Sequence, residues 1–87
     1  MIDEIQFTEE AWRDFEWFLE RDKRIIKRIR DLLKDIARHP NEGIGKPERL
    51  RFQLSGYWSR RITKEHRLVY KVDEEVIIVI SCRYHYE

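Results

Sequence analysis

The longest apolar run of the 87-residue chain is Val76-Ile77-Ile78-Val79-Ile80. Five residues are far too few to cross a bilayer, but they suit a strand that is buried inside a sheet. A polar turn at Asp73 to Glu75 precedes the run. In Arg67 to Val72 before it, one side would carry Leu68, Tyr70 and Val72 and the other Arg67, Val69 and Lys71. We therefore predict two adjacent antiparallel strands, the second a central strand that extends from Val76 to Tyr84.

Three further strands are predicted upstream of this pair. Tyr57 to Thr63 predicts one strand, and Ser55-Gly56 predicts the turn before it. Leu50, Phe52 and Leu54 alternate with polar residues, which predicts a strand with one apolar and one basic face. Met1 to Phe7 alternates imperfectly and predicts a short edge or early strand.

Two helices are predicted between the first strand and the others. Thr8 can cap a helix that keeps apolar residues at three- and four-residue spacing through Glu20. Asp22 can cap a second helix, which His39-Pro40 would end. The expected fold is a single α+β domain over residues 1–87, in which two N-terminal helices pack on one face of a mainly antiparallel sheet in the order β-α-α-β-β-β-β.

Charge is nearly balanced overall but unevenly distributed. The chain has 18 basic and 17 acidic side chains, and Met1 to Asp22 holds eight of the acidic ones. Lys46 to Arg67 holds seven basic and two acidic residues, which favours an anionic ligand on that part of the molecule. Cys82 is the only cysteine, and we identify neither an export leader nor a membrane span, so we expect a cytoplasmic protein without a membrane partner.

Strand alternation predicts which side chains share the open face of the sheet. Arg67 lies opposite to Leu68 and Tyr70, whereas Arg83 and His85 share one side of the last strand. The alternation therefore allows Arg67 and His85 to lie on one basic surface. Two other basic residues could join them there, and these are Arg51 and Arg61. Cys82 falls on the same side as Ile78, Ile80 and Tyr84, which predicts a core thiol and not a nucleophile.

RNA cleavage without a metal needs a base, a cation beside the phosphate and an acid. Glu48 is the candidate base, Arg67 the candidate cation and His85 the candidate acid, while Tyr86 can stack on a base or orient the phosphate. Each residue has an ordinary alternative: a surface ion pair for Glu48, solvation of the sheet for Arg67, and aromatic cover over the sheet edge for the tail. No metal or nucleotide cofactor is expected, because the histidines are scattered and Gly43 to Lys46 lacks the phosphate-loop pattern.

Four blocks in the same order resemble the YoeB/Txe toxins of the RelE/ParE superfamily. They are Gly45-Lys46-Pro47-Glu48, Leu54 to Thr63, Glu65 to Tyr70 and Cys82-Arg83-Tyr84-His85-Tyr86. This resemblance implies a RelE-like fold and the toxin of a type II toxin-antitoxin pair, a ribosome-dependent, metal-independent endoribonuclease that cuts mRNA in the A site by 2′-hydroxyl attack.

The same resemblance implies roles for individual residues and a set of partners. Glu48 matches the general base, Arg67 the phosphate-stabilising arginine, His85 the general acid and Tyr86 the terminal tyrosine that positions mRNA. The expected substrate-binding residues are Lys46, Arg51, Arg61 and Arg83. The expected partners are a cognate antitoxin, the ribosome with mRNA, and a second copy in a homodimer.

The chain departs from the family pattern at Ile44, Arg49 and Glu87. One alternative stays open, a non-catalytic RNA-binding or antitoxin-binding module on the same scaffold.

Overall fold

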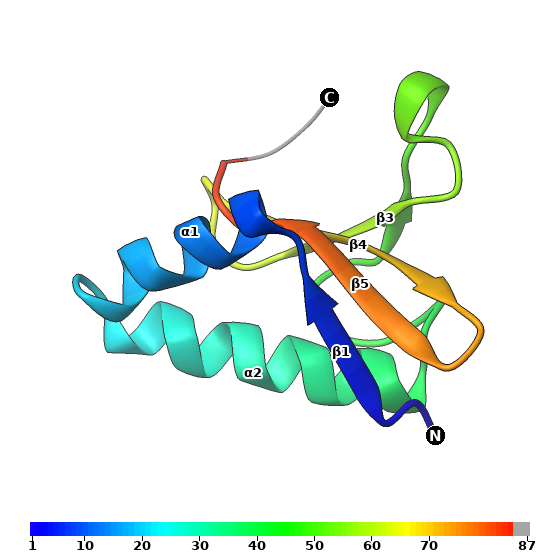
Figure 1. Ribbon diagram of the computed structural model, residues 1–87, viewed down its shortest axis with the longest axis horizontal. Helices are drawn as coiled ribbons and strands as arrows, with labels where there is room; N and C mark the ends of the chain where they lie inside the picture. The colour runs from blue at the N-terminus through cyan, green and yellow to red at the C-terminus, as the bar shows by residue number, and fades with distance from the viewer. Residues whose placement is uncertain (85–87) are drawn as a thin grey trace.

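The computed structural model describes residues 1–84, which form a five-stranded sheet with two helices on one of its faces (Figure 1). The strands are β1 (Glu4–Phe7), β2 (Glu48–Arg49), β3 (Trp58–Arg61), β4 (Arg67–Asp73) and β5 (Val76–Ser81). The helices are α1 (Glu9–Leu19) and α2 (Lys23–Arg38), and a single 3₁₀ turn, η1, spans Phe52–Leu54. The predicted order β-α-α-β-β-β-β is confirmed.

The strands lie side by side in the order β1-β5-β4-β3-β2. β5 pairs with β4 in antiparallel and with β1 in parallel orientation, so the apolar run is an inner strand as expected. β1 is the only parallel strand of the described sheet, because the helical pair α1–α2 separates it from the antiparallel strands. β5 ends at Ser81 and not at Tyr84, since the next backbone N–H, that of Cys82, turns to the carboxylate of Asp14 on α1 at 3.1 Å.

Side-chain caps define where the helices begin. The hydroxyl of Thr8 accepts a hydrogen bond from the backbone N–H of Ala11, and the carboxylate of Asp22 accepts one from Arg24. That backbone bond is the main reason why the pKa of Asp22 lies below its ordinary value. The two helices then bury one apolar stripe against the sheet. The core includes Phe18, Ile29, Leu32, Ile36, Leu68, Tyr70, Ile77 and Val79.

Arg60 of β3 is fully buried on the helix-covered face, and all five of its N–H groups have acceptors. Its Nε donates to the hydroxyl of Tyr70 at 3.1 Å, and Nη1 donates to Asp35 Oδ2 on α2 at 2.5 Å. The remaining donors reach backbone carbonyls of the loop after α2, at Ile44, His39 and Glu42. A single guanidinium therefore joins the sheet, α2 and the loop.

The loop from 39 to 47 closes around this arginine. Gly43 has φ +122°, and a Cβ there would lie 1.9 Å from Asp35 Oδ2. Only glycine fits, because any side chain would displace the carboxylate that pairs with Arg60. Burial by itself raises the pKa of Asp35, but hydrogen bonds from Arg60 and from the N–H of Ile44 outweigh it and hold the pKa below its ordinary value.

The predicted strand over residues 50–54 is wrong. Pairing of this segment with β3 ends at Arg49, and Phe52 adopts φ +59°, which no strand tolerates. The N–H of Leu54 bonds to the carbonyl of Arg51, and the N–H of Tyr57 bonds to that of Leu54, so the chain coils tightly before β3. The alternating side chains are those of a loop that projects from the sheet, drawn in green in Figure 1.

Cys82 lies in the core as predicted, but with different neighbours. It is fully buried together with Ile77 and Val79, whereas Ile78 and Ile80 face the other side of β5. The expected alternation fails because the strand ends before Cys82. Burial, and secondarily the nearby carboxylate of Asp14, raises the pKa of this thiol to about 12.

We predict that Asp35→Asn lowers the free energy of unfolding by about 3 kcal/mol, because it leaves the charge of Arg60 buried without a counterion. The folded pKa of Asp35 is below the ordinary value of 3.8, so its contribution is complete above that pH and is lost as the pH falls through the folded value. Urea unfolding measures the loss. Asp31→Asn breaks the exposed pair with Lys27 and serves as the control, with an expected cost below about 1 kcal/mol. Equal losses in the two variants would contradict the role given to Arg60.

We also predict that Cys82 does not react with iodoacetamide at pH 8 in the folded protein. The thiolate is the reactive form, and at this pH a thiol with a pKa of about 12 stays protonated and is also shielded from the reagent. Mass spectrometry after unfolding in urea should show complete alkylation of the same residue, which provides the control. Modification of the native protein at the rate of a free thiol would refute a core role for Cys82.

Candidate functional site

Glu48 and Arg67 come together on the face of the sheet that the helices do not cover. Nη2 of Arg67 lies 3.5 Å from Oε1 of Glu48, and Nη1 donates to the hydroxyl of Ser59 at 3.2 Å. The side chain of Glu48 is 57% exposed and that of Arg67 is 19% exposed. A reachable carboxylate therefore stands beside a guanidinium whose orientation is fixed by a neighbouring strand.

Strand register explains this meeting of residues that are far apart in the sequence. Glu48 pairs with Ser59 of β3, and Ser59 pairs with Val69 of β4. Arg67 lies two residues before Val69 and thus on the same face. Arg61 pairs directly with Arg67, so two arginines lie opposite each other across β3 and β4. Like charges in this position destabilise a sheet and attract an anion.

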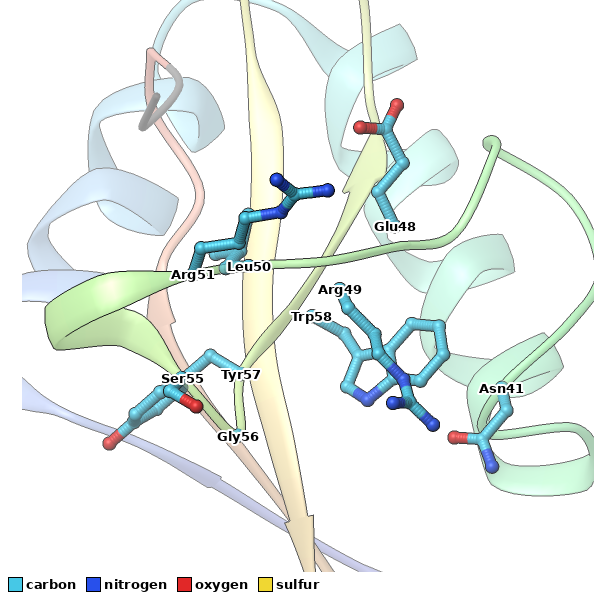
Figure 2. A pocket seen from close by; sticks show the side chains of 9 residues that line it. All are labelled: Asn41, Glu48, Arg49, Leu50, Arg51, Ser55, Gly56, Tyr57 and Trp58. Carbon is cyan, nitrogen blue, oxygen red and sulfur yellow. The ribbon is translucent and has the colours of Figure 1, made fainter.

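Arg51 and Lys46 flank Glu48 on the same stretch of chain. Figure 2 shows the guanidinium of Arg51 on the same side of the segment as the carboxylate of Glu48, whereas Arg49 turns the other way and packs over Trp58 at 5.5 Å. Lys46 is exposed and has φ +51°. Its position is set by the preceding residue, since the carbonyl of Gly45 accepts a hydrogen bond from the N–H of Arg61 at 2.6 Å.

A hollow of about 730 Å³ borders this segment (Figure 2). Its size is within the range of ligand pockets in general. It is lined by Asn41, Glu48, Arg49, Leu50, Arg51, Ser55, Gly56, Tyr57 and Trp58. The lining of the hollow includes the candidate base Glu48 but not Arg67, so the hollow lies beside the Glu48–Arg67 pair.

Arg83, a predicted substrate-binding residue, is not brought to this pair. Its guanidinium lies 3.7 Å from the ring centre of Trp17 on α1, and Nη2 donates to the hydroxyl of Tyr84 at 3.1 Å. The buried Nε of Arg83 has no hydrogen-bond partner among the described residues, which fits a guanidinium stacked on an indole ring. Arg83 thus fastens the C-terminal segment to α1.

The candidate acid His85 and the candidate positioning residue Tyr86 lie outside the described residues. The last described residue is Tyr84, which is 58% exposed and has φ +61°. Its carbonyl accepts a hydrogen bond from the N–H of Arg67 at 2.8 Å, and its own N–H donates to Nδ1 of His66 at 2.7 Å. Tyr84, the residue directly before His85, is therefore hydrogen-bonded to the backbone of Arg67.

Ser59 and His66 were not singled out from the sequence. Strand parity could have suggested Ser59, because it lies two residues before Arg61 and so shares its face. No sequence signal indicates His66, since its contact with Tyr84 exists only once the C-terminal segment folds back beside β4.

Within residues 1–84, no cluster of three His, Cys, Asp or Glu side chains is arranged to hold a metal ion. The helices in the same range are also too short or too polar to cross a membrane.

Comparison with known proteins gives the family. Residues 7–86 match the family described as YoeB-like toxin of bacterial type II toxin-antitoxin system. The Toxin YoeB of Synechocystis is 57% identical over 83 residues, which are 95% of this chain and 96% of the relative. A structure of the YoeB dimer from Staphylococcus aureus has a TM-score of 0.92 at 49% identity and covers 99% of this chain and 100% of its own.

A heterotetrameric YoeB–YefM toxin-antitoxin complex, also from Staphylococcus aureus, aligns with a TM-score of 0.89 at 52% identity over 94% of this chain and 95% of its own. The family match over residues 7–86, the sequence identity over nearly the whole chain and the shape of the fold agree, and the chain belongs to the family of YoeB-like toxins of bacterial type II toxin-antitoxin systems.

Proposed function

We propose that this toxin is an endoribonuclease that cuts mRNA in the A site of the ribosome and thereby stops translation. The observation that carries the proposal is the contact between the exposed carboxylate of Glu48 and the guanidinium of Arg67, 3.5 Å apart on an open face. A base and a phosphate-binding cation must lie this close together to act on one phosphodiester group.

The chemistry is a transesterification within the RNA. Glu48 takes the proton from the 2′-hydroxyl, whose oxygen forms a bond to the adjacent phosphorus as the bond from phosphorus to the 5′-oxygen breaks. His85 gives a proton to that leaving oxygen. The products are a cyclic phosphate on one fragment and a free 5′-hydroxyl on the other, so neither water nor an oxidant is consumed.

Arg67 supplies charge where the transition state needs it. The crowded phosphate carries more negative charge on its non-bridging oxygens than the substrate does, and a planar guanidinium can donate to two of them. Ser59 holds one end of this guanidinium, and Arg61 lies opposite Arg67 across the two strands. An incoming phosphate therefore relieves the repulsion between the two arginines.

Substrate binding is proposed to extend along the loop before β3. Lys46 and Arg51 are exposed on either side of Glu48 and contact the RNA backbone. Tyr86 stacks on a base or orients the scissile phosphate. Arg83, whose guanidinium is stacked on Trp17, is proposed to anchor the segment around Tyr84 to α1, and its direct contact with RNA stays a prediction.

The proposed partners follow from the family. A structure of the YoeB dimer and a complex of YoeB with YefM are known for relatives. We propose the same two kinds of partner here, a second copy of the chain and a cognate antitoxin, together with the ribosome in the cytoplasm. The antitoxin covers the basic face, where it competes with mRNA for the arginines.

We predict that Glu48→Gln and Arg67→Ala each slow cleavage of ribosome-bound mRNA by about 10²- to 10⁴-fold, the range for a positioned base or a charge-stabilising donor. Glutamine keeps the size of the side chain but takes up no proton, and alanine removes the phosphate contact. Primer extension on translated mRNA gives the rate. Glu75→Gln makes the same chemical change in the distant turn between β4 and β5 and should leave the rate unchanged.

The outcome also separates catalysis from binding. Wild-type protein that binds ribosomes at a toxic concentration but leaves mRNA uncut would refute the nuclease and favour a non-catalytic module. Wild-type rates for both site variants would instead remove Glu48 and Arg67 from the mechanism.

A further inference from the structure

His66 accepts a hydrogen bond from the backbone of the C-terminal segment. Nδ1 of its imidazole lies 2.7 Å from the backbone nitrogen of Tyr84, whose N–H is the donor. An imidazole nitrogen that accepts a hydrogen bond carries no hydrogen itself, so the neutral ring has its hydrogen on Nε2. The contact fixes both the tautomer and the direction of the ring.

The ring is held in place from several directions. It packs edge to face on the buried ring of Phe18 at 5.0 Å between centres, and Tyr84 lies 5.4 Å away. The backbone is fixed as well, because the N–H of His66 donates to the hydroxyl of Thr63 and its carbonyl accepts from the N–H of Ile62. Nδ1 is therefore a rigid acceptor and not a mobile surface group.

Tyr84 is held in a conformation that it would not adopt alone. Its φ of +61° lies in the left-handed region, which is rare and strained for an aromatic residue. Two adjacent residues of the chain stabilise it, since His66 binds its N–H and the N–H of Arg67 binds its carbonyl at 2.8 Å. The adjacent residues His66 and Arg67 thus form hydrogen bonds with both the backbone N–H and the backbone carbonyl of Tyr84.

These two hydrogen bonds bear directly on the proposed acid and the proposed phosphate-binding residue. The carbonyl of Tyr84 belongs to the peptide bond that leads to His85, the proposed acid, while Arg67 is the proposed phosphate-binding residue. The hydrogen bond from the N–H of Arg67 to the carbonyl of Tyr84 therefore connects the residue before the proposed acid to β4, the strand that carries the proposed cation.

We propose that His66 is a positioning residue of the nuclease site, whose Nδ1 fixes the backbone of Tyr84, the residue that directly precedes the proposed acid. The inference rests on the proposed function and assigns no chemical step to His66 itself. It predicts an effect on the cleavage step and none on ribosome binding, because the arginines that attract the RNA are untouched.

Two substitutions test the acceptor. His66→Leu removes it, and we expect the single-turnover cleavage rate to fall about 10- to 100-fold, as a displaced catalytic group commonly causes. His66→Asn places an oxygen acceptor near the position of Nδ1, and it should recover most of the rate. The dissociation constant for ribosomes should change by less than about twofold in both variants, since no phosphate contact is lost. Urea unfolding checks that the variants are folded under the assay conditions.

A backbone ester tests the donor without touching any side chain. Cys82 permits ligation of a synthetic peptide of residues 82–87 to the rest of the chain, and the peptide N–H of Tyr84 can be replaced by an ester oxygen in that peptide. The full-length ester protein should lose about as much cleavage rate as His66→Leu, and combining the two changes should cost little more, because both break one hydrogen bond.

The failure of this inference can be told from failure of the proposed function. If His85→Ala cleaves at the wild-type rate, the proposed acid is wrong. If His85→Ala is inactive but His66→Leu and the ester protein both cleave normally, only the positioning role is overturned. Equal losses in His66→Leu and His66→Asn together with reduced stability would likewise overturn it in favour of a packing role.

Discussion

The interaction on which the rest of the structure depends is the buried ion pair between Arg60 and Asp35. A guanidinium without solvent contact is tolerated only when every N–H group has an acceptor, and Arg60 meets that condition with a carboxylate, a tyrosine hydroxyl and three loop carbonyls. These acceptors come from β4, α2 and the loop after it. The hydrogen bonds from Arg60 hold the loop, which leads directly into the two-residue strand that carries Glu48.

A second set of contacts fixes the other end of the chain. Asp14 binds the N–H of Cys82, Trp17 stacks on Arg83, and His66 binds the N–H of Tyr84. Two irregular segments therefore flank the described part of the site, and each is fastened to a helix or a turn by specific contacts. The regular strands contribute Arg61, Ser59 and Arg67, whose spacing the sheet register sets.

The sequence predicts the regular part of this arrangement because regular elements have a period. Local spacing predicts the apolar faces of the two helices and the strand that contains Val76 to Ile80. It also predicts the two sides of β4 and so places Arg67 on the face that the helices leave open. Alternation misleads over residues 50–54, where pairing with β3 has already ended at Arg49 and Phe52 turns to positive φ. It also fails for Arg83, since a strand that ends at Ser81 no longer dictates where that side chain points. The burial of Arg60 cannot be predicted from local spacing, because it depends on acceptors that are far away in the sequence.

The site places two like charges next to each other, and the free energy that this costs must be offset by packing elsewhere in the fold. Arg61 and Arg67 face each other across two strands, and Glu48 offsets one of these charges only at 3.5 Å and with partial exposure. Such an arrangement weakens a sheet unless other interactions hold the strands. The core under β3 and β4 and the ion pair of Arg60 supply that support from the opposite face. The cationic surface is thus already formed in the free chain. If the proposed function holds, the free energy gained on binding a phosphate is not spent on assembling this surface.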